Sequence, residues 1–429
     1  MKISRKTISW TFFNRAIGAV LQFLFTLYVA RVLGAEYSGI FFLLSTLLIG
    51  FSVLGKFGLD IGLSRILSQF AGNNGKNLKA VYLSVIKICL ITSGFLTFCG
   101  LIFSKEISEF FFNNGNSTLS VQLTFLTIIP FCLIWVHSCF FKCIGMPSLS
   151  GFIEITAIPF LTIVISFFIG IFQSLTVELL ALSFLISNIL VLVLAITVSL
   201  RRVKTNNDIT LVEVEFNKIL EIVLPLILAS ILDFLLTWLT AFILSYFHSE
   251  DKVGIYNVAF RVGRIITFFL VIVSSLYMGR LTKLVTENDL VSLKYEARKI
   301  SNILFITCLP ALIGIYLFSF NILKLFGEEF VEGNLCLKLI ATGQFFNVST
   351  GMASTLLILT GNGKYLMYNS LYIAIFVLIS SLIILPNSSV LGAGLISAIA
   401  LISINIANCF SLYKRTNILS VPYFNIFKK

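Results

Sequence analysis

Charged residues are scarce in this chain. Asp, Glu, Lys and Arg together make up only 12% of its 429 residues, whereas 58% are hydrophobic and the mean hydropathy is +1.01. A water-soluble domain needs far more polar residues than this, so the composition excludes a soluble protein. Any function must therefore be sought inside a membrane.

The residue types that bind metals or form catalytic sets are also few. The chain has two histidines, His137 and His248, far apart in the sequence, and its eight cysteines lie mostly within apolar runs. We expect no metal site and no disulfide, because such cysteines act as small buried hydrophobes. The largest predicted outer connector, residues 104–120, carries three charges and no histidine. We therefore expect no catalytic residues and no cofactor, with proton or sodium coupling left open.

Long apolar runs dominate what is present. Twelve of them are long enough to cross a membrane, because a hydrocarbon core about 30 Å thick needs roughly 20 residues of α-helix. The runs are continuous rather than alternating, which favours helices over a β-barrel. The predicted spans are residues 9–30, 38–59, 81–103, 121–141, 149–172, 175–200, 219–246, 255–279, 300–326, 335–360, 365–385 and 391–413. We expect the first span to be a retained helix, since no small-residue cleavage site follows it.

Basic residues are distributed unevenly between the two sides of this predicted topology. With a cytoplasmic amino terminus, 21 Lys and Arg residues fall on the cytoplasmic side, and only Arg31, Lys105 and Lys252 fall on the other side. The positive-inside rule therefore predicts that both termini are cytoplasmic. The rule also accounts for the net charge of +12, so we expect anionic membrane lipids as partners and no nucleic acid.

The chain contains an internal repeat. Shifts of 215 or 216 residues align positions at corresponding loops and helix ends, including Gly39 with Gly254, Arg65 with Arg280, and Gly145 with Gly361. Six spans per repeat is an even number, so the two halves have the same orientation and are related as parallel repeats. We predict an all-α protein with an N-terminal lobe at residues 1–205, a cytoplasmic linker at 206–218 and a C-terminal lobe with a basic tail at 219–429.

Several segments resemble the polysaccharide repeat-unit flippases (Wzx type) of the multidrug/oligosaccharidyl-lipid/polysaccharide exporter superfamily. The segment ARVLGAEYSGIF, residues 30–41, is similar to that family's signature between its first two helices. Further similar segments are VGIYNVAFR at 253–261, LFGEEF at 325–330, LTGNG at 359–363 and VLGAG at 390–394. Their order and spacing extend the resemblance over nearly the whole chain.

This resemblance implies a fold like that of the multidrug exporters of the superfamily, with two six-helix lobes around a cavity that opens alternately to either side. It implies transport of an undecaprenyl-pyrophosphate-linked oligosaccharide, an O-antigen, capsule or exopolysaccharide unit, across the bacterial inner membrane. Polymerase and chain-length proteins of the same pathway are then expected partners. No catalytic residue set is implied.

Arginines inside the spans are the strongest site candidates. A charged side chain at a helix centre costs roughly 2.5–3.5 kcal/mol to insert, so it needs an anion, a carboxylate or water beside it. Arg15 lies inside the first span, and Arg261 and Arg264 lie inside the eighth span at positions i and i+3, on one helix face. A guanidinium binds phosphate oxygens through several donors, and we expect these three residues to hold the pyrophosphate. The alternative is a structural pair with Asp233.

Three further charged residues complete the candidate set. Lys56 is a possible cavity cation, but Asp60 lies four residues further on and can pair with it on the same helix face. Asp233 is the carboxylate nearest the middle of a span. It is predicted to pair with an arginine or to act as a protonation or cation site, because desolvation favours the uncharged form of a carboxylic acid.

Two other functions compete with a flippase. An ion-coupled small-molecule or multidrug exporter of the same superfamily should show several carboxylates in one lobe and few cavity cations, and this chain shows the reverse. A membrane glycan polymerase, ligase or transferase should bring a substantial outer loop or a convergent acid–base set. The leading interpretation is therefore a non-enzymatic flippase.

Overall fold

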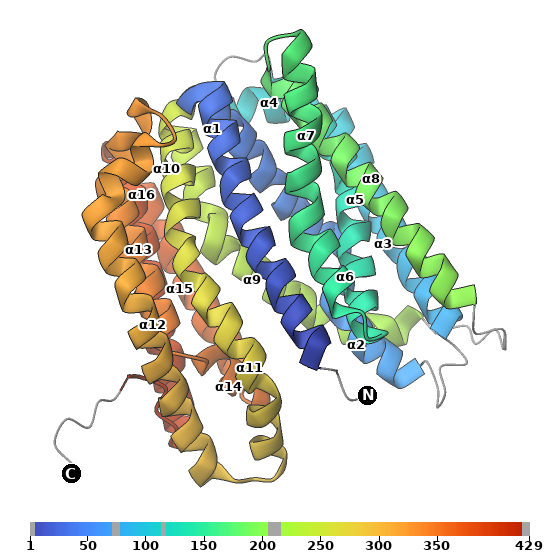
Figure 1. Ribbon diagram of the computed structural model, residues 1–429, viewed down its shortest axis with the longest axis vertical. Helices are drawn as coiled ribbons and strands as arrows, with labels where there is room; N and C mark the ends of the chain where they lie inside the picture. The colour runs from blue at the N-terminus through green and yellow to red at the C-terminus, as the bar shows by residue number, and fades with distance from the viewer. Residues whose placement is uncertain (1–4, 71–77, 113–116, 205–215, 423–429) are drawn as a thin grey trace. The chain divides into compact units, whose positions relative to one another are not determined.

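The computed structural model describes residues 5–70, 78–112, 117–204 and 216–422, and every regular element among them is a helix (Figure 1). The chain divides into two compact units. The first comprises Met1–Leu33 and Ile40–Phe234, and the second comprises Gly34–Gly39 and Leu235–Lys429. Most of the predicted linker, residues 206–215, lies outside the described residues, and the predicted lobe boundaries stay a prediction.

The first unit contains nine elements, counting the long helix that opens the chain, of which Gly34–Gly39 belong to the second unit. They are α1 (Arg5–Lys56), followed by α2 (Leu59–Phe70), α3 (Leu78–Ile102), α4 (Ser104–Phe111), α5 (Thr118–Cys143), α6 (Pro147–Gly151), the π-helical turn η1 (Phe152–Thr156), α7 (Ala157–Phe172) and α8 (Val177–Lys204). The next helix, α9 (Phe216–Phe247), belongs to this unit as far as Phe234.

Helix α1 is two helices joined end to end. Its 52 residues include Gly34, whose φ of 75° and ψ of 180° are not helical. The helix ends at Lys56 because Phe57 and Gly58 both take positive φ angles, 53° and 70°. Gly58 also approaches another helix closely, since a Cβ there would lie 2.9 Å from the carbonyl oxygen of Val223. A larger residue would therefore meet both backbone strain and a steric clash.

Helix α5 is the centre of the first unit and packs against α3 and α8 (Figure 1). The contact with α3 is close because Gly100 has no side chain, and a Cβ there would lie 1.9 Å from the ring of Phe125. The hydroxyl of Thr97 donates to the Phe125 carbonyl over 3.1 Å, so a polar side chain is satisfied inside the apolar interface.

Proline shapes the fifth predicted span. Pro159 is the third residue of α7 and has no N–H to donate to the turn before it. That turn is η1, whose π-helical pairing accommodates the missing donor. The irregularity therefore lies one turn before the proline itself.

The second unit contains the rest of α9 and ten further elements. They are α10 (Glu250–Gly263), the 3-10 turn η2 (Arg264–Ile266), α11 (Thr267–Thr286), α12 (Leu290–Lys324), η3 (Glu328–Gly333), α13 (Asn334–Ser349), α14 (Ala353–Leu359), α15 (Gly363–Ile384), η4 (Leu385–Asn387) and α16 (Val390–Thr416). Helix α13 is central and packs against α12 and α16 (Figure 1).

An amide network ties α13 to α16 in the second unit. The side-chain amide of Asn405 donates to Asn347 Oδ1 over 3.1 Å, and the Thr350 hydroxyl donates to Asn405 Oδ1 over 3.1 Å. The helices approach closely at Gly343, where a Cβ would lie 3.0 Å from the backbone of Ala398. Small residues and interhelical hydrogen bonds are the usual means of association where no hydrophobic effect operates.

Two residues of the predicted repeat, Gly39 and Gly254, contact each other within the second unit. A Cβ on Gly39 would lie 1.9 Å from the Glu250 carbonyl oxygen, and a Cβ on Gly254 would lie 2.2 Å from the Ala35 carbonyl oxygen. Ala35 and Glu250 are themselves 215 residues apart. The contact is thus reciprocal, as expected where a local two-fold axis passes between equivalent residues.

The prediction of an all-α polytopic membrane protein is confirmed. In the described part of the chain, ten segments are long and apolar enough to span a membrane. One of them, Phe13–Leu67, has 55 residues and contains the non-helical Gly34, and the predicted tenth span is divided between α13 and α14. The count of twelve crossings therefore stays a prediction.

Candidate functional site

The two arginines of the eighth predicted span lie at an interruption of the helix. Arg261 is in the last turn of α10, and Arg264 begins the 3-10 turn η2, where the α-helical hydrogen-bond pattern is replaced by a tighter one. The Thr267 hydroxyl donates to the Arg264 carbonyl over 2.7 Å and so satisfies one group of this turn. Such breaks within a span expose backbone polar groups beside the side chains they carry.

An aromatic ring lies beside each guanidinium group. The Arg261 Cζ lies 6.0 Å from the ring centroid of Trp238 on α9, and the Arg264 Cζ lies 5.8 Å from that of Phe260. The Trp238 and Phe260 rings are 5.6 Å apart. Arg261 is half-buried and Arg264 is exposed, so the pair extends from the packed interior toward the surface of its unit. Cation–π contacts offset part of the cost of burying positive charge.

Arg15 belongs to the first unit and is half-buried, and a Cβ on Gly151 of α6 would lie 3.9 Å from its Cγ. Its Nε is buried and makes no hydrogen bond among the residues that the structure describes. The neighbouring Asn14 fixes this part of α1, because its amide donates to the Ser148 carbonyl over 3.3 Å and its carbonyl accepts from Thr156. Within the described part of the chain, no ion pair holds this guanidinium, so its place follows from the course of α1.

A groove of about 520 Å³ is lined by Asn14, the residue before Arg15. Its wall is formed by Asn14, by the turn that leads from α5 into α6, and by residues of α6 and η1 that include Ser148 and Phe152. Both polar and apolar groups line it, which is typical of sites for amphipathic ligands. This groove lies entirely within the first unit.

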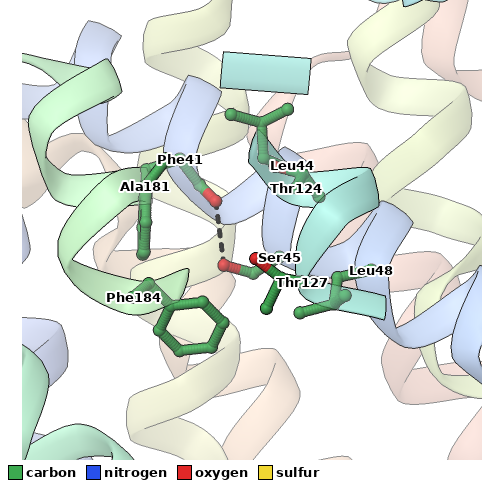
Figure 2. Close-up of a pocket in the computed structure, with 8 residues that line it drawn as sticks. All are labelled: Phe41, Leu44, Ser45, Leu48, Thr124, Thr127, Ala181 and Phe184. Atoms are coloured by element: carbon green, nitrogen blue, oxygen red, sulfur yellow. Dashed lines mark hydrogen bonds between the residues drawn. The ribbon is translucent and has the colours of Figure 1, made fainter. Parts of the chain in front are cut away.

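A second, much smaller cavity lies between α1, α5 and α8 (Figure 2). The sticks in Figure 2 show the Ser45 hydroxyl turned toward the Phe41 carbonyl, to which it donates over 2.9 Å. The accessible space is about 10 Å³, which is roughly the size of one water molecule. It cannot hold a transported substrate.

Lys56 and Asp60 form the ion pair expected from their spacing. The Lys56 Nζ lies 2.9 Å from Asp60 Oδ2, and both side chains are largely buried. The same ammonium group lies 4.7 Å from the ring centroid of Trp135 on α5. A cation that is already neutralised contributes less field to a ligand, so a substrate role for Lys56 stays a prediction.

Asp233 is exposed on α9 and belongs to the first unit, whereas Arg261 and Arg264 belong to the second. The predicted pairing of Asp233 with an arginine is therefore not tested, and neither is its role in ion coupling. Within each unit the structure brings together Arg261 with Arg264, and Lys56 with Asp60.

The aromatic partners of the cations were not anticipated from the sequence. Phe260 could have been found, because it precedes Arg264 by four residues and therefore shares its helix face. Trp135 and Trp238 could not, since each lies on a different helix from its cation and only tertiary packing joins them.

Comparison with known proteins identifies the family. A profile described as "Polysaccharide biosynthesis protein" matches residues 4–278. A capsular polysaccharide biosynthesis protein of Staphylococcus aureus, CapF, is 26% identical over 49% of this chain and 52% of its own length. A probable low-salt glycan biosynthesis flippase of Haloferax volcanii, Agl15, is 23% identical over 80% of this chain and 69% of its own length. The chain thus spans about half of the first relative and more of the second.

Solved structures confirm the fold expected from the resemblance. The lipid II flippase MurJ in an inward closed conformation superposes with a TM-score of 0.76 at 16% identity, over 95% of this chain and 87% of that one. An inward-facing multidrug resistance MATE transporter of the MOP superfamily gives 0.74 at 16% identity, over 95% and 94% of the two chains. At this identity the likeness establishes the fold alone. Because the profile matches well over half of its length, the chain belongs to the polysaccharide biosynthesis protein family, and it is a multi-pass membrane protein of the MOP-superfamily fold.

Proposed function

We propose that this protein is a flippase that carries an undecaprenyl-pyrophosphate-linked oligosaccharide repeat unit from the cytoplasmic to the outer leaflet of a bacterial inner membrane. Membership of the polysaccharide biosynthesis family is the observation that carries the proposal. The glycan flippase among its relatives supports the same class of substrate. No chemical bond is made or broken, so the protein acts by alternating access rather than as an enzyme.

The arginines account for the anionic part of such a substrate. A pyrophosphate loses its hydration in the membrane, and a guanidinium replaces water with several charge-assisted hydrogen bonds. Arg264, exposed at the helix break, is the best placed of the three, while Arg261 behind it adds positive potential. Arg15, which follows the groove residue Asn14, contributes cationic charge from the other half of the sequence.

Both termini are cytoplasmic in this proposal, and the pathway's polymerase and chain-length proteins receive the translocated unit. Fusions of a reporter at residues 250 and 330 should report the exterior, and fusions at 290 should report the interior. The same signal from two adjacent loops would contradict the topology.

The test of the site is to replace Arg264 by alanine in cells that depend on this protein for surface polysaccharide. We expect export to be lost while the protein stays in the membrane at its normal level, and Arg264→Lys to restore part of it. Lysine restores the positive charge but lacks the planar set of donors of a guanidinium. Partial rescue would therefore show that export depends on phosphate binding and not only on correct folding.

Lys283→Ala is the matched control, because this lysine lies further along α11 with its side chain 73% exposed. It should export normally. Normal export by a well-expressed Arg15→Ala/Arg261→Ala/Arg264→Ala variant would remove the arginines from the proposal. Accumulation of lipid-linked units in cells that lack the protein would still support a flippase.

The competing function is an ion-coupled exporter, for which Asp233 is the candidate carboxylate because it is exposed within a span. Asp233→Asn distinguishes the two. If a proton or sodium gradient drives uptake of a drug-like cation into vesicles and Asp233→Asn abolishes it, the exporter is favoured. If Asp233→Asn leaves glycan export intact, transport does not require this carboxylate.

A further inference from the structure

Lys364, Tyr365 and Arg415 meet where α14 turns into α15, and we name this group the α15 corner. Gly361 ends α14 with a left-handed φ of 75°. The chain then starts α15 at Gly363, which places Lys364 in its first turn. Helix α16 packs against α15 and carries Lys414 and Arg415 in its last turn. Two helix ends therefore bring their basic residues to one place.

One aromatic ring is shared by two cations at this corner. The Arg415 Cζ lies 4.2 Å from the centroid of the Tyr365 ring, and the Lys364 Nζ lies 5.3 Å from the same centroid. Both basic residues are exposed and the tyrosine is half-buried. Contact with the ring compensates part of the repulsion between the two charges. The two cations are therefore held next to one ring at the same corner.

No carboxylate of the surrounding helices neutralises the α15 corner. The last acidic residue of the whole sequence is Glu332, so α14, η4 and α16, which pack against α15, contain none. Arg415 lies at the C-terminus of α16, where a cation complements the helix dipole. Lys364 lies at the N-terminus of α15, where a cation is unfavourable. An anion from outside the protein would offset this cost.

Tyrosines continue from the cations along the same face of α15. Tyr368 and Tyr372 follow Tyr365 at helical spacing, and they are 48% and 68% exposed. Tyrosine is typical of the boundary between headgroups and hydrocarbon, since its ring is apolar and its hydroxyl polar. Because α15 begins a candidate membrane span, this exposed face combines positive charge at the helix end with aromatic surface along the span.

We propose that the α15 corner binds the phosphate headgroup of an anionic phospholipid such as phosphatidylglycerol or cardiolipin. Lys364 and Arg415 supply the charge, Tyr365 holds them together, and Tyr368 and Tyr372 contact the glycerol and upper acyl region of the lipid. This site is separate from the arginines of the proposed transport path and does not depend on which glycan is carried.

The test is native mass spectrometry of the full-length protein in detergent, titrated with phosphatidylglycerol and, in parallel, with phosphatidylcholine. Wild-type protein should bind phosphatidylglycerol preferentially. Lys364→Gln/Arg415→Gln should bind it about 30-fold more weakly, because each basic residue near an anionic surface contributes about fivefold. The matched control is Lys105→Gln/Lys283→Gln, which removes the same charge from side chains that are 76% and 73% exposed and have a carboxylate within 4 Å. It should bind as wild type.

Tyr365→Leu provides a second variant that keeps apolar volume and both charges. It should weaken binding by a smaller factor, because the cations lose their shared ring. Elution as a single species and an unchanged helical circular dichroism spectrum establish that each variant is folded. Undiminished phosphatidylglycerol binding in the double variant would overturn the proposal. It would also be overturned if the double variant bound phosphatidylglycerol normally but no longer bound undecaprenyl pyrophosphate. Displacement of the phospholipid by inorganic phosphate at equal concentration would overturn it as well.

Discussion

The two units turn from one helix into the next in the same way at two equivalent positions. Gly145 ends α5 with φ of 81°, and Gly361 ends α14 with φ of 75°. Each turn has one hydrogen bond that closes six residues and one that closes four, which is the Schellman pattern. In the first turn the Met146 N–H donates to the Phe141 carbonyl over 2.8 Å and the Gly145 N–H donates to the Lys142 carbonyl over 3.3 Å. In the second turn the Asn362 N–H donates to the Leu357 carbonyl over 2.8 Å and the Gly361 N–H donates to the Ile358 carbonyl over 3.1 Å.

The charges placed on this shared backbone differ. In the first unit the Lys142 ammonium lies 2.8 Å from Glu154 Oε2, which also accepts from the Ser138 hydroxyl over 2.7 Å. In the second unit Lys364 and Arg415 share a tyrosine ring with no acidic residue on the neighbouring helices. The repeat therefore preserves the chain geometry, while the polar chemistry at equivalent corners has diverged. One corner is neutral within the protein, and the other retains charge for an external partner.

The largest predicted loss of stability is at Gly39 and Gly254, the repeat-related glycines that contact each other. Gly39→Ala and Gly254→Ala should each destabilise the protein by about 3 kcal/mol, the upper end of typical overpacking costs, because the new Cβ would meet a backbone carbonyl at 1.9 or 2.2 Å. The double variant should lose less stability than the two single variants lose together, since one separation of the helices relieves both clashes. Thermal unfolding in detergent, followed by fluorescence-detected elution, measures this.

Gly314→Ala is the control, because nothing lies within 4 Å of a Cβ there and the residue is inside α12. It should be neutral or stabilising by up to about 1 kcal/mol. Full additivity of the Gly39 and Gly254 variants would show that the two contacts are independent and would remove the argument for a local two-fold axis.

The neutralised corner of the first unit predicts an intermediate effect. Glu154→Gln keeps a hydrogen-bond acceptor for Ser138 but leaves Lys142 without its carboxylate, and we expect a loss of about 1–2 kcal/mol in the same unfolding assay. Glu109→Gln is the control, because its pair with Lys105 spans 3.9 Å with both side chains mostly exposed. That variant should change stability by under about 0.5 kcal/mol. Equal effects of the two would mean that burial does not strengthen the Glu154 pair.

Sequence patterns predicted those features that depend on local spacing. The apolar runs gave the helical spans. The four-residue spacing gave the ion pair between Lys56 and Asp60, which forms although α1 ends at Lys56 and α2 begins at Leu59. The repeat shift aligned Gly145 with Gly361, and both glycines do take the left-handed conformation. These signals are readable because helix periodicity and positive φ are properties of a few adjacent residues.

Features set by packing between distant segments were not predictable. The 3-10 turn at Arg264 follows Gly263, where a Cβ would lie 2.7 Å from Ile340 on another helix. The Ala35 amide donates to Glu329 over 2.6 Å across 294 residues of sequence. Neither relation has a local signature, so the arginines could be placed along the chain but their surroundings could not.

The smallest predicted effect comes from giving the α15 corner a carboxylate of its own. Tyr368→Glu places a carboxylate four residues after Lys364, where the two side chains share a helix face and can pair as Lys142 and Glu154 do in the first unit. We expect phosphatidylglycerol affinity to fall about fivefold, the contribution of one basic residue near an anionic surface. Tyr368→Gln removes the same ring without adding charge, so its smaller loss measures the aromatic contact alone. If both variants bind the phospholipid equally, an added carboxylate does not weaken lipid binding at this corner. The difference in charge between the two corners would then have no consequence for lipid binding.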